Sequence, residues 1–253
     1  MRVHLHRPGL PTHHAGTVSL RLRLIGISVA GLAGVAGVAW GLRPLVGTTS
    51  QHLPAALAVF GFVMALALAA SAAHPFPVVG PANLVTTVRA ALLSLLAALI
   101  GQPVTASVGW AAVVLAVAAI ALDGADGALA RRSGLASAFG ARFDMETDAA
   151  LVMVLSILIW MHGKAGAWVL LGGLARYLFI ASGWVWPWMR GSLSPTFRAK
   201  LVAIVHLSGL TTALAPLVPQ PYSAVAAGVT LAALLWSFGV DVGRLRRAAG
   251  LSA

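Results

Sequence analysis

The chain has 253 residues, of which 59% are hydrophobic and only 9% are charged, and its mean hydropathy is +0.91. Soluble globular domains carry about 25% charged residues, so this composition excludes that class and indicates a polytopic integral membrane protein. The absence of cysteine excludes disulfides, thiolate metal sites and cysteine nucleophiles. The net charge of +11 comes from basic residues scattered between apolar runs, so we attribute it to membrane orientation and expect no nucleic-acid partner.

The apolar segments are long enough to predict the fold class. A helix that crosses a bilayer needs about 20 mostly apolar residues. Eight segments meet this need, and short stretches rich in Pro and Gly separate them. We predict an all-α fold with about eight transmembrane helices, near residues 22–41, 53–73, 84–100, 107–131, 141–162, 166–186, 200–217 and 222–240.

The first segment, residues 22–41, follows basic residues in the way that a secretory signal peptide does. Its apolar stretch is longer than the core of a signal peptide, which has about 7 to 15 residues. We therefore interpret it as a retained helix.

Basic residues indicate the orientation of the predicted helices. With the N-terminus in the cytoplasm, all but three of the 17 Lys and Arg residues lie on the cytoplasmic side. Arg43 and Lys164 lie on the far side, and Arg176 lies in mid-span. We expect a multi-pass protein of the cell membrane with both termini in the cytoplasm.

Five of the six acidic residues lie between residues 122 and 150. Asp123 and Asp126 are three residues apart near the cytoplasmic end of the fourth segment, and Asp144 and Asp148 are four apart at the start of the fifth. Each pair therefore shares one helical face, and a rise of about 1.5 Å per residue brings all four carboxylates to similar depths. Because like charges this close repel, they must bind cations or be partly protonated.

The residue types around the aspartates favour metal binding. Oxygen ligands with no His or Cys nearby suit Mg²⁺ or Mn²⁺ better than zinc. Four carboxylates from two helices can hold two ions about 4 Å apart, an arrangement that clamps both sides of a phosphoryl displacement. Gly127 and Ala130 follow Asp123 on the same face and leave space for a ligand, and Arg131 offers a guanidinium suited to phosphate.

Two motifs carry a resemblance to a known family. In "PANLVTTVRA", Asn83, Thr86 and Arg89 have the N-x-x-T-x-x-R arrangement that often opens the first core helix of the CDP-alcohol phosphotransferase (CDP-alcohol phosphatidyltransferase) family. The resemblance covers about residues 81–240, and the six segments from residue 84 onward correspond to the six-helix core of that family. Eight residues at fixed spacing resemble the signature of the same family: Asp123, Asp126, Gly127, Ala130, Arg131, Gly140, Asp144 and Asp148.

The resemblance implies an activity in phospholipid biosynthesis. Members transfer a substituted phosphate group from a CDP-linked donor to the hydroxyl of an alcohol acceptor and release CMP. In many bacterial members the donor is CDP-diacylglycerol and the transferred group is phosphatidyl. The family also suggests a homodimer, and its active site would lie at the cytoplasmic boundary of the bilayer.

The resemblance also implies the roles of individual residues. Asp123, Asp126, Asp144 and Asp148 would hold two Mg²⁺ or Mn²⁺ ions, and Asp148 would also deprotonate the acceptor hydroxyl. The nucleotide would be bound beside them by Gly127, Ala130, Arg131, Gly140, Asn83 and Thr86.

Four basic residues are further candidates for binding the acceptor or a phosphate: Arg89, Arg176, Arg198 and Lys200. An unpaired arginine in mid-span is costly, so Arg176 either binds phosphate, which we favour, or neutralises an aspartate. The positive-inside rule explains Arg198 and Lys200 equally well. Many phospholipid-forming members have a P-S-x-x-G-K pattern in this region, which the chain lacks, so the acceptor is not identified.

Two acidic residues have structural interpretations. Glu146 points off the face that Asp144 and Asp148 share, and we expect it to be solvated or structural. We expect Asp241 to pair with the arginines near the C-terminus.

The predicted organisation has four parts. Residues 1–21 form a basic tail, residues 22–80 form two additional N-terminal helices, residues 81–243 form the six-helix catalytic core, and residues 244–253 form a second basic tail.

Two other functions fit an intramembrane acidic cluster. A cation transporter would use it as an ion path, but no acidic residue continues the path across the bilayer, and nearby basic residues favour anions. A catalytically silent membrane scaffold of the same fold stays open as well, and the intact set of four aspartates argues against it. Turnover of a CDP-lipid with release of CMP separates the transferase from both.

The predicted orientation can be tested with single cysteines, because the native chain has none. Cysteines introduced within residues 133–139 should react with a membrane-impermeant thiol reagent only from the cytoplasmic side. Cysteines within residues 102–106 should react only from outside, and the reverse pattern would invert the topology.

Overall fold

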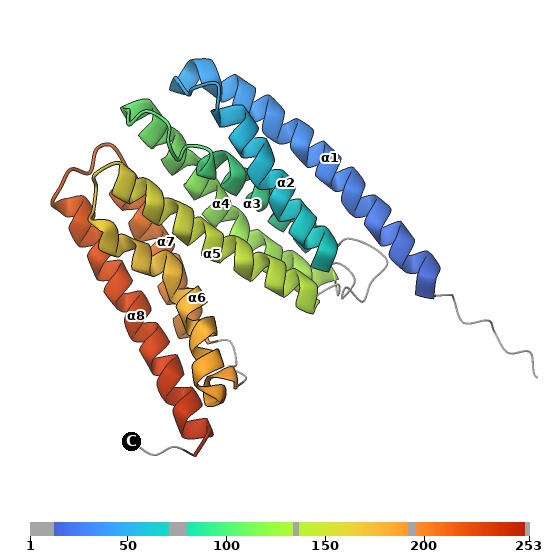
Figure 1. The fold of residues 1–253 in the computed structure, drawn as a ribbon, viewed down its shortest axis with the longest axis vertical. Coiled ribbons are helices and arrows are strands. Elements are labelled where there is room, and N and C mark those ends of the chain that lie inside the picture. The colour runs from blue at the N-terminus through green and yellow to red at the C-terminus, as the bar shows by residue number, and fades with distance from the viewer. Residues whose placement is uncertain (1–12, 71–79, 134–136, 192–195, 251–253) are drawn as a thin grey trace, which may run out of the picture.

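The computed structural model describes residues 13–70, 80–133, 137–191 and 196–250, with side chains described from residue 20 onward and omitted for residues 125–133. The described residues contain helices and no strand (Figure 1). In chain order these are α1 (His13–Val46), α2 (His52–Ala70), α3 (Pro81–Ala97), α4 (Ala106–Ser133), α5 (Ala138–Met161), η2 (Ala167–Val169), α6 (Leu170–Val185), η3 (Pro187–Arg190), α7 (Phe197–Leu214) and α8 (Tyr222–Ala248).

The all-α, polytopic membrane fold predicted from the sequence is confirmed. In the part of the chain that the structure describes, six helices are long and apolar enough to cross a membrane. The two remaining α-helices are α3, a shorter apolar helix, and α5, which carries three acidic residues near its start. Each of the eight predicted segments overlaps one of the eight α-helices of the described residues. Six of these helices, and not all eight, are long and apolar enough to count as membrane spans.

Local signals set where the helices of the site begin. α3 starts after Gly80 with Pro81 in its first turn, a position where the missing backbone N–H costs nothing. α5 starts after Ser137, whose hydroxyl accepts a hydrogen bond from the backbone N–H of Gly140 at 3.1 Å. Where each helix begins therefore determines how far along it the charged side chains lie: Arg89 on α3, and Asp144 and Asp148 on α5.

The helices lie alongside one another, with α1 and α2 on one side of the bundle and α8 on the other (Figure 1). α3 packs against α1, α2, α4 and α5, and α5 also packs against α6 and α7. The start of α1, the end of α4, the start of α5 and the end of α8 lie at the same end of the bundle. The acidic region therefore lies at the end of the bundle where α1 begins and α8 ends.

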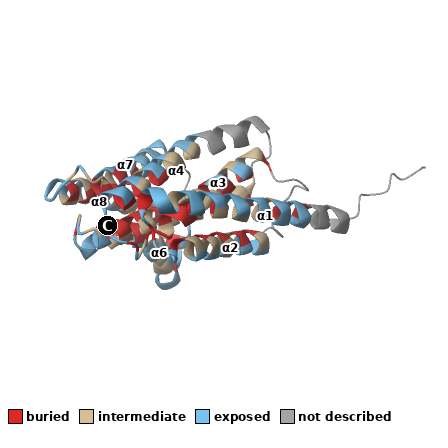
Figure 2. Cartoon of the chain, turned by 90° about the horizontal axis from the view of Figure 1, so that it is seen from above, coloured by how far each residue is buried: buried red, intermediate tan, exposed pale blue. Residues whose placement is uncertain are grey.

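Buried and exposed residues separate as expected for a protein surrounded by lipid. Buried residues lie where helices meet, whereas the outward faces are exposed (Figure 2). Leu96, Leu155 and Leu210 are buried in the core that joins α3, α5 and α7. Large apolar side chains such as Phe62 and Trp236 point outward and are 66% and 60% exposed, a pattern that would be unfavourable in water and suits hydrocarbon.

Close packing of α6 on α5 depends on a glycine. A Cβ atom added at Gly173 would lie 2.7 Å from the Cα of Met153 in α5, so the two backbones touch there. By contrast, a Cβ added at Gly239 in α8 would have no neighbour within 4 Å.

This difference predicts opposite effects of the same substitution. Gly173→Ala must push α6 away from α5 and should lower the Tm of the purified protein in detergent by several degrees. Gly239→Ala should leave the Tm unchanged or raise it, because alanine favours a helix over glycine by about 1 kcal/mol. Equal Tm values for the two variants would contradict the close contact.

Candidate metal and phosphate site

Three helices bring one arginine and three aspartates of the motifs together. Arg89 comes from α3, Asp123 from α4, and Asp144 and Asp148 from α5. The Arg89 Nη1 atom donates to Asp144, and Nη2 donates to Asp148. The same Nη2 lies 3.1 Å from Asp123 Oδ1, so one guanidinium contacts all three carboxylates.

Burial differs between the arginine and its partners. The Arg89 side chain is 1% exposed, whereas Asp123 is 18% exposed and Asp144 and Asp148 are each 35% exposed. The guanidinium therefore forms the buried inner wall of the site, and the carboxylates open toward the outside. A buried guanidinium is costly without partners, and the three carboxylates offset that cost. One positive charge against three negative charges leaves the group with a surplus of two negative charges.

The three carboxylates have the chemistry and the spacing of a divalent-cation site. One oxygen atom from each of Asp123, Asp144 and Asp148 lies within 4.8 Å of the others. Carboxylate oxygens are the ligands that Mg²⁺ and Mn²⁺ prefer, and a buried cation already lies among them. The residues present therefore fit a divalent metal ion.

Four residues of the predicted site are on α4 beyond Asp123. The side chains of Asp126, Gly127, Ala130 and Arg131 lie outside the described part of the chain. Their predicted roles stay predictions.

The two motifs, which the sequence treats separately, touch each other in the fold. A Cβ atom added at Gly140 would lie 2.6 Å from Asn83 Oδ1, so the absence of a side chain at residue 140 lets Asn83 approach α5. Asn83 and Thr86 are 7% and 2% exposed, and they lie about two turns and about one turn, respectively, before Arg89 on α3. The first motif therefore extends the site along α3 toward the start of α5.

Arg176 is turned to a different partner. Its Nη2 atom donates to Glu146 Oε1 at 2.6 Å, and the two side chains are 25% and 44% exposed. Glu146 is two residues from both Asp144 and Asp148 on α5, and therefore faces another direction. The structure thus pairs Arg176 with an acidic residue outside the aspartate cluster, which weakens the case for phosphate binding.

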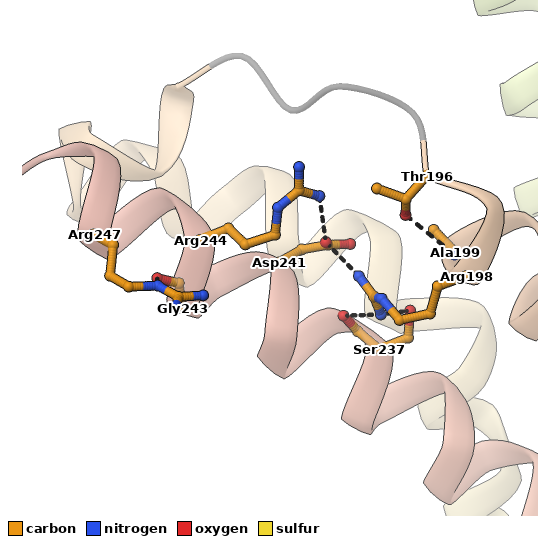
Figure 3. Close-up of polar contacts among 8 residues, drawn as sticks. All are labelled: Thr196, Arg198, Ala199, Ser237, Asp241, Gly243, Arg244 and Arg247. Carbon is orange, nitrogen blue, oxygen red and sulfur yellow. Dashed lines mark hydrogen bonds and ion pairs between the residues drawn. The ribbon is translucent and has the colours of Figure 1, made fainter.

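Arg198 is held in a contact between α7 and α8 (Figure 3). Its Nη2 atom lies 2.6 Å from Asp241 Oδ1, and its Nη1 atom donates to the backbone oxygen of Ser237 at 2.9 Å. Asp241 also lies 3.4 Å from Arg244, which is a pairing with an arginine near the C-terminus as the sequence predicts. Lys200, in the first turn of α7, is exposed.

The ion pairs of Arg89 were not foreseen from the sequence, which assigned it to phosphate or acceptor binding. The sequence nevertheless contains a feature that points to these ion pairs. An arginine two turns inside an apolar helix needs an acidic partner, and five of the six acidic residues of the chain lie in one stretch. The argument that predicts a partner for Arg176 therefore applies to Arg89 as well.

Comparison with known proteins gives one match. The family model described as CDP-alcohol phosphatidyltransferase matches residues 80–239, which is more than half of the chain and runs from the start of α3 into α8. No curated protein and no solved structure matches the chain at a significant level. The matched region contains both motifs and excludes α1 and α2.

Proposed function

Because the chain belongs to the CDP-alcohol phosphatidyltransferase family, we propose that it transfers a phosphatidyl group from CDP-diacylglycerol or a related CDP-linked lipid to the hydroxyl of an alcohol, with release of CMP. The product would be a phospholipid. We place the reaction at the cytoplasmic face of the cell membrane, where the acyl chains stay in lipid while the nucleotide and the acceptor meet water.

The observation that carries the proposal is the convergence of Asp123, Asp144 and Asp148 on one partly buried site. With Asp126 these side chains would hold two Mg²⁺ or Mn²⁺ ions. When bound, such ions polarise phosphate oxygens and stabilise the charge that develops during phosphoryl transfer. The carboxylates alone would repel the diphosphate of the donor. By holding divalent cations, they would make the same region able to bind it.

We assign the acceptor proton to Asp148. Its Oδ1 atom is engaged by Arg89, which fixes the orientation of the carboxylate, and a carboxylate has a second oxygen able to accept a proton. A hydroxyl held within hydrogen-bond reach of that oxygen would lose its proton as it attacks the phosphorus, while the bond from phosphorus to CMP breaks.

The nucleotide would lie beside the first motif. Asn83 and Thr86 are polar and buried, and Asn83 lies against Gly140 at the start of α5. We propose that these residues, with Gly127, Ala130 and Arg131, bind the CMP part of the donor. Residues 81–243 would then form the catalytic core, with α1 and α2 added to it.

The burial of Arg89 also bears on the transporter alternative. A fixed, buried guanidinium lies at the inner wall of the aspartates and would repel a cation moving farther into the membrane. This favours a site open to one face over an ion path.

The function can be tested with the purified protein in detergent. CDP-diacylglycerol supplied with glycerol 3-phosphate, inositol phosphate or a simple alcohol should yield CMP and a new lipid with one of these acceptors. Mass spectrometry of the lipid would identify the acceptor. Absence of CMP release with every acceptor would favour the silent-scaffold alternative.

Divalent metal should be required through the aspartates. EDTA should abolish turnover and added Mg²⁺ or Mn²⁺ should restore it, while Asp123→Asn and Asp144→Asn should reduce kcat by at least about 10³-fold. Glu146→Gln is the matched control, because it changes an acidic residue of the same helix that faces Arg176. Full turnover in excess EDTA, or loss of activity in the control as large as that of Asp144→Asn, would contradict the assignment.

The base role of Asp148 predicts a different kinetic pattern. Asp148→Asn should bind donor and metal with nearly normal affinity and lose about 10²- to 10⁴-fold in kcat, since only the transition state needs the proton transfer. Donor affinity and kcat are measured separately, in binding and in turnover assays. If Asp148→Asn loses donor binding as completely as Asp123→Asn, Asp148 is mainly a metal ligand.

A further inference from the structure

We infer that Arg89 is a built-in counter-ion of the aspartate site, which competes with divalent cations for the same carboxylates and so weakens their binding. The inference rests on the metal site of the proposed function. It adds that the chain carries its own cation at this site, and that this cation limits how tightly metal is held.

The contacts of Arg89 are with the atoms that a metal ion needs. Its two terminal nitrogens contact one oxygen each of Asp123, Asp144 and Asp148, and these three residues are the ones whose oxygens lie within 4.8 Å of one another. Every hydrogen bond that Arg89 makes to a carboxylate engages lone pairs that a cation would otherwise use. A positive charge next to the site also repels a second positive charge directly.

Arg89 has a clear role before metal binds. Three carboxylates so close together repel one another, and in a partly buried site water screens that repulsion poorly. The guanidinium stays protonated at any accessible pH, so the compensation it provides is constant. Because Arg89 is 1% exposed, a mobile ion from solution cannot replace this compensation from the inner side.

Two other arginines of the bundle show what is unusual about Arg89. Arg176 has one acidic partner, Glu146, and Arg198 has one, Asp241. Both arginines are about one quarter exposed, at 25% and 24%. Arg89 instead has three acidic partners and is buried. Of these three arginines, Arg89 is therefore the one whose removal changes the charge of the aspartate site most.

If Arg89 had a purely structural role, its removal would have the opposite effect on metal affinity. If Arg89 only holds the aspartates in the geometry that binds metal, removing it should weaken metal binding. If it competes, removing it should strengthen metal binding, since the surplus of negative charge among the described residues rises from two to three. The sign of the change separates the two roles.

The experiment measures Mn²⁺ binding to the full-length chain in detergent, from the loss of the electron paramagnetic resonance signal of free Mn²⁺. Arg89→Gln should lower the Kd for Mn²⁺ by about tenfold or more. Arg89→Lys keeps the charge and should bind Mn²⁺ nearly as the unaltered protein does. Arg176→Gln is the matched control, because it removes an arginine paired to the same helix, and its Kd should stay within about twofold of the unaltered value.

Thermal unfolding supplies a second readout. Without divalent ions, Arg89→Gln should have a lower Tm than the unaltered protein, because its carboxylates repel without compensation. Saturating Mn²⁺ should then raise its Tm by more than it raises that of the unaltered protein or of Arg176→Gln. If Arg89→Gln can be purified only with Mn²⁺ present, its selective unfolding on chelation is the same result in stronger form.

Three outcomes overturn the inference. These are a Kd of Arg89→Gln that is unchanged or higher, failure of Arg89→Gln to fold even with Mn²⁺, and absence of Mn²⁺ binding by the unaltered protein. None of these measurements needs turnover. A lack of CMP release combined with the expected order of Mn²⁺ affinities would reject the transfer reaction and leave the counter-ion role of Arg89 intact.

Discussion

The burial of one guanidinium among three carboxylates is the constraint on which the arrangement of α3, α4 and α5 depends. Arg89 lies inside an apolar bundle at 1% exposure, where an unpaired charge costs several kcal/mol. Only acidic groups from neighbouring helices can offset this cost. Asp123 on α4 and Asp144 and Asp148 on α5 must therefore face α3 at the depth of Arg89, which fixes the rotation of both helices relative to it.

Small residues make the required approach of the helices possible. Gly140 leaves room for the Asn83 side chain where α5 begins, and Gly173 brings α6 onto the backbone of α5 at Met153. In lipid the hydrophobic effect does not drive helices together. Close van der Waals contact at such positions therefore accounts for a larger share of the helix-packing energy than it does in water. These glycines let α5 approach α3 and α6 closely, and the ion pairs of Arg89 set which face of α5 turns toward α3.

Charges of this protein fall into groups with separate tasks. Arg89 and the aspartates form the site, the pair of Arg176 and Glu146 joins α6 to α5, and Arg198 with Asp241 joins α7 to α8. The last two pairs are partly exposed, and in both the acidic group has at least one arginine partner, since Asp241 also lies 3.4 Å from Arg244. Among the side chains that the structure describes, the aspartate site has more acidic than basic groups, and this imbalance suits it to bind cations and, through them, the phosphates of a donor.

The sequence by itself determined the eight helices, their approximate limits and the common depth of the acidic residues, because apolar length, helix breakers and a three- or four-residue spacing are local properties. It also gave the family, since the motif residues keep fixed spacing along one stretch of chain. Only the tertiary structure decided the partners of Arg89, Arg176 and Arg198, and it brought Asn83 against Gly140. These pairs join different helices, and most are separated by 30 to 59 residues in sequence. Which side chains meet across two helices depends on their rotation and relative shift, which are set by packing summed over the whole interface and leave no periodic signal in either helix alone.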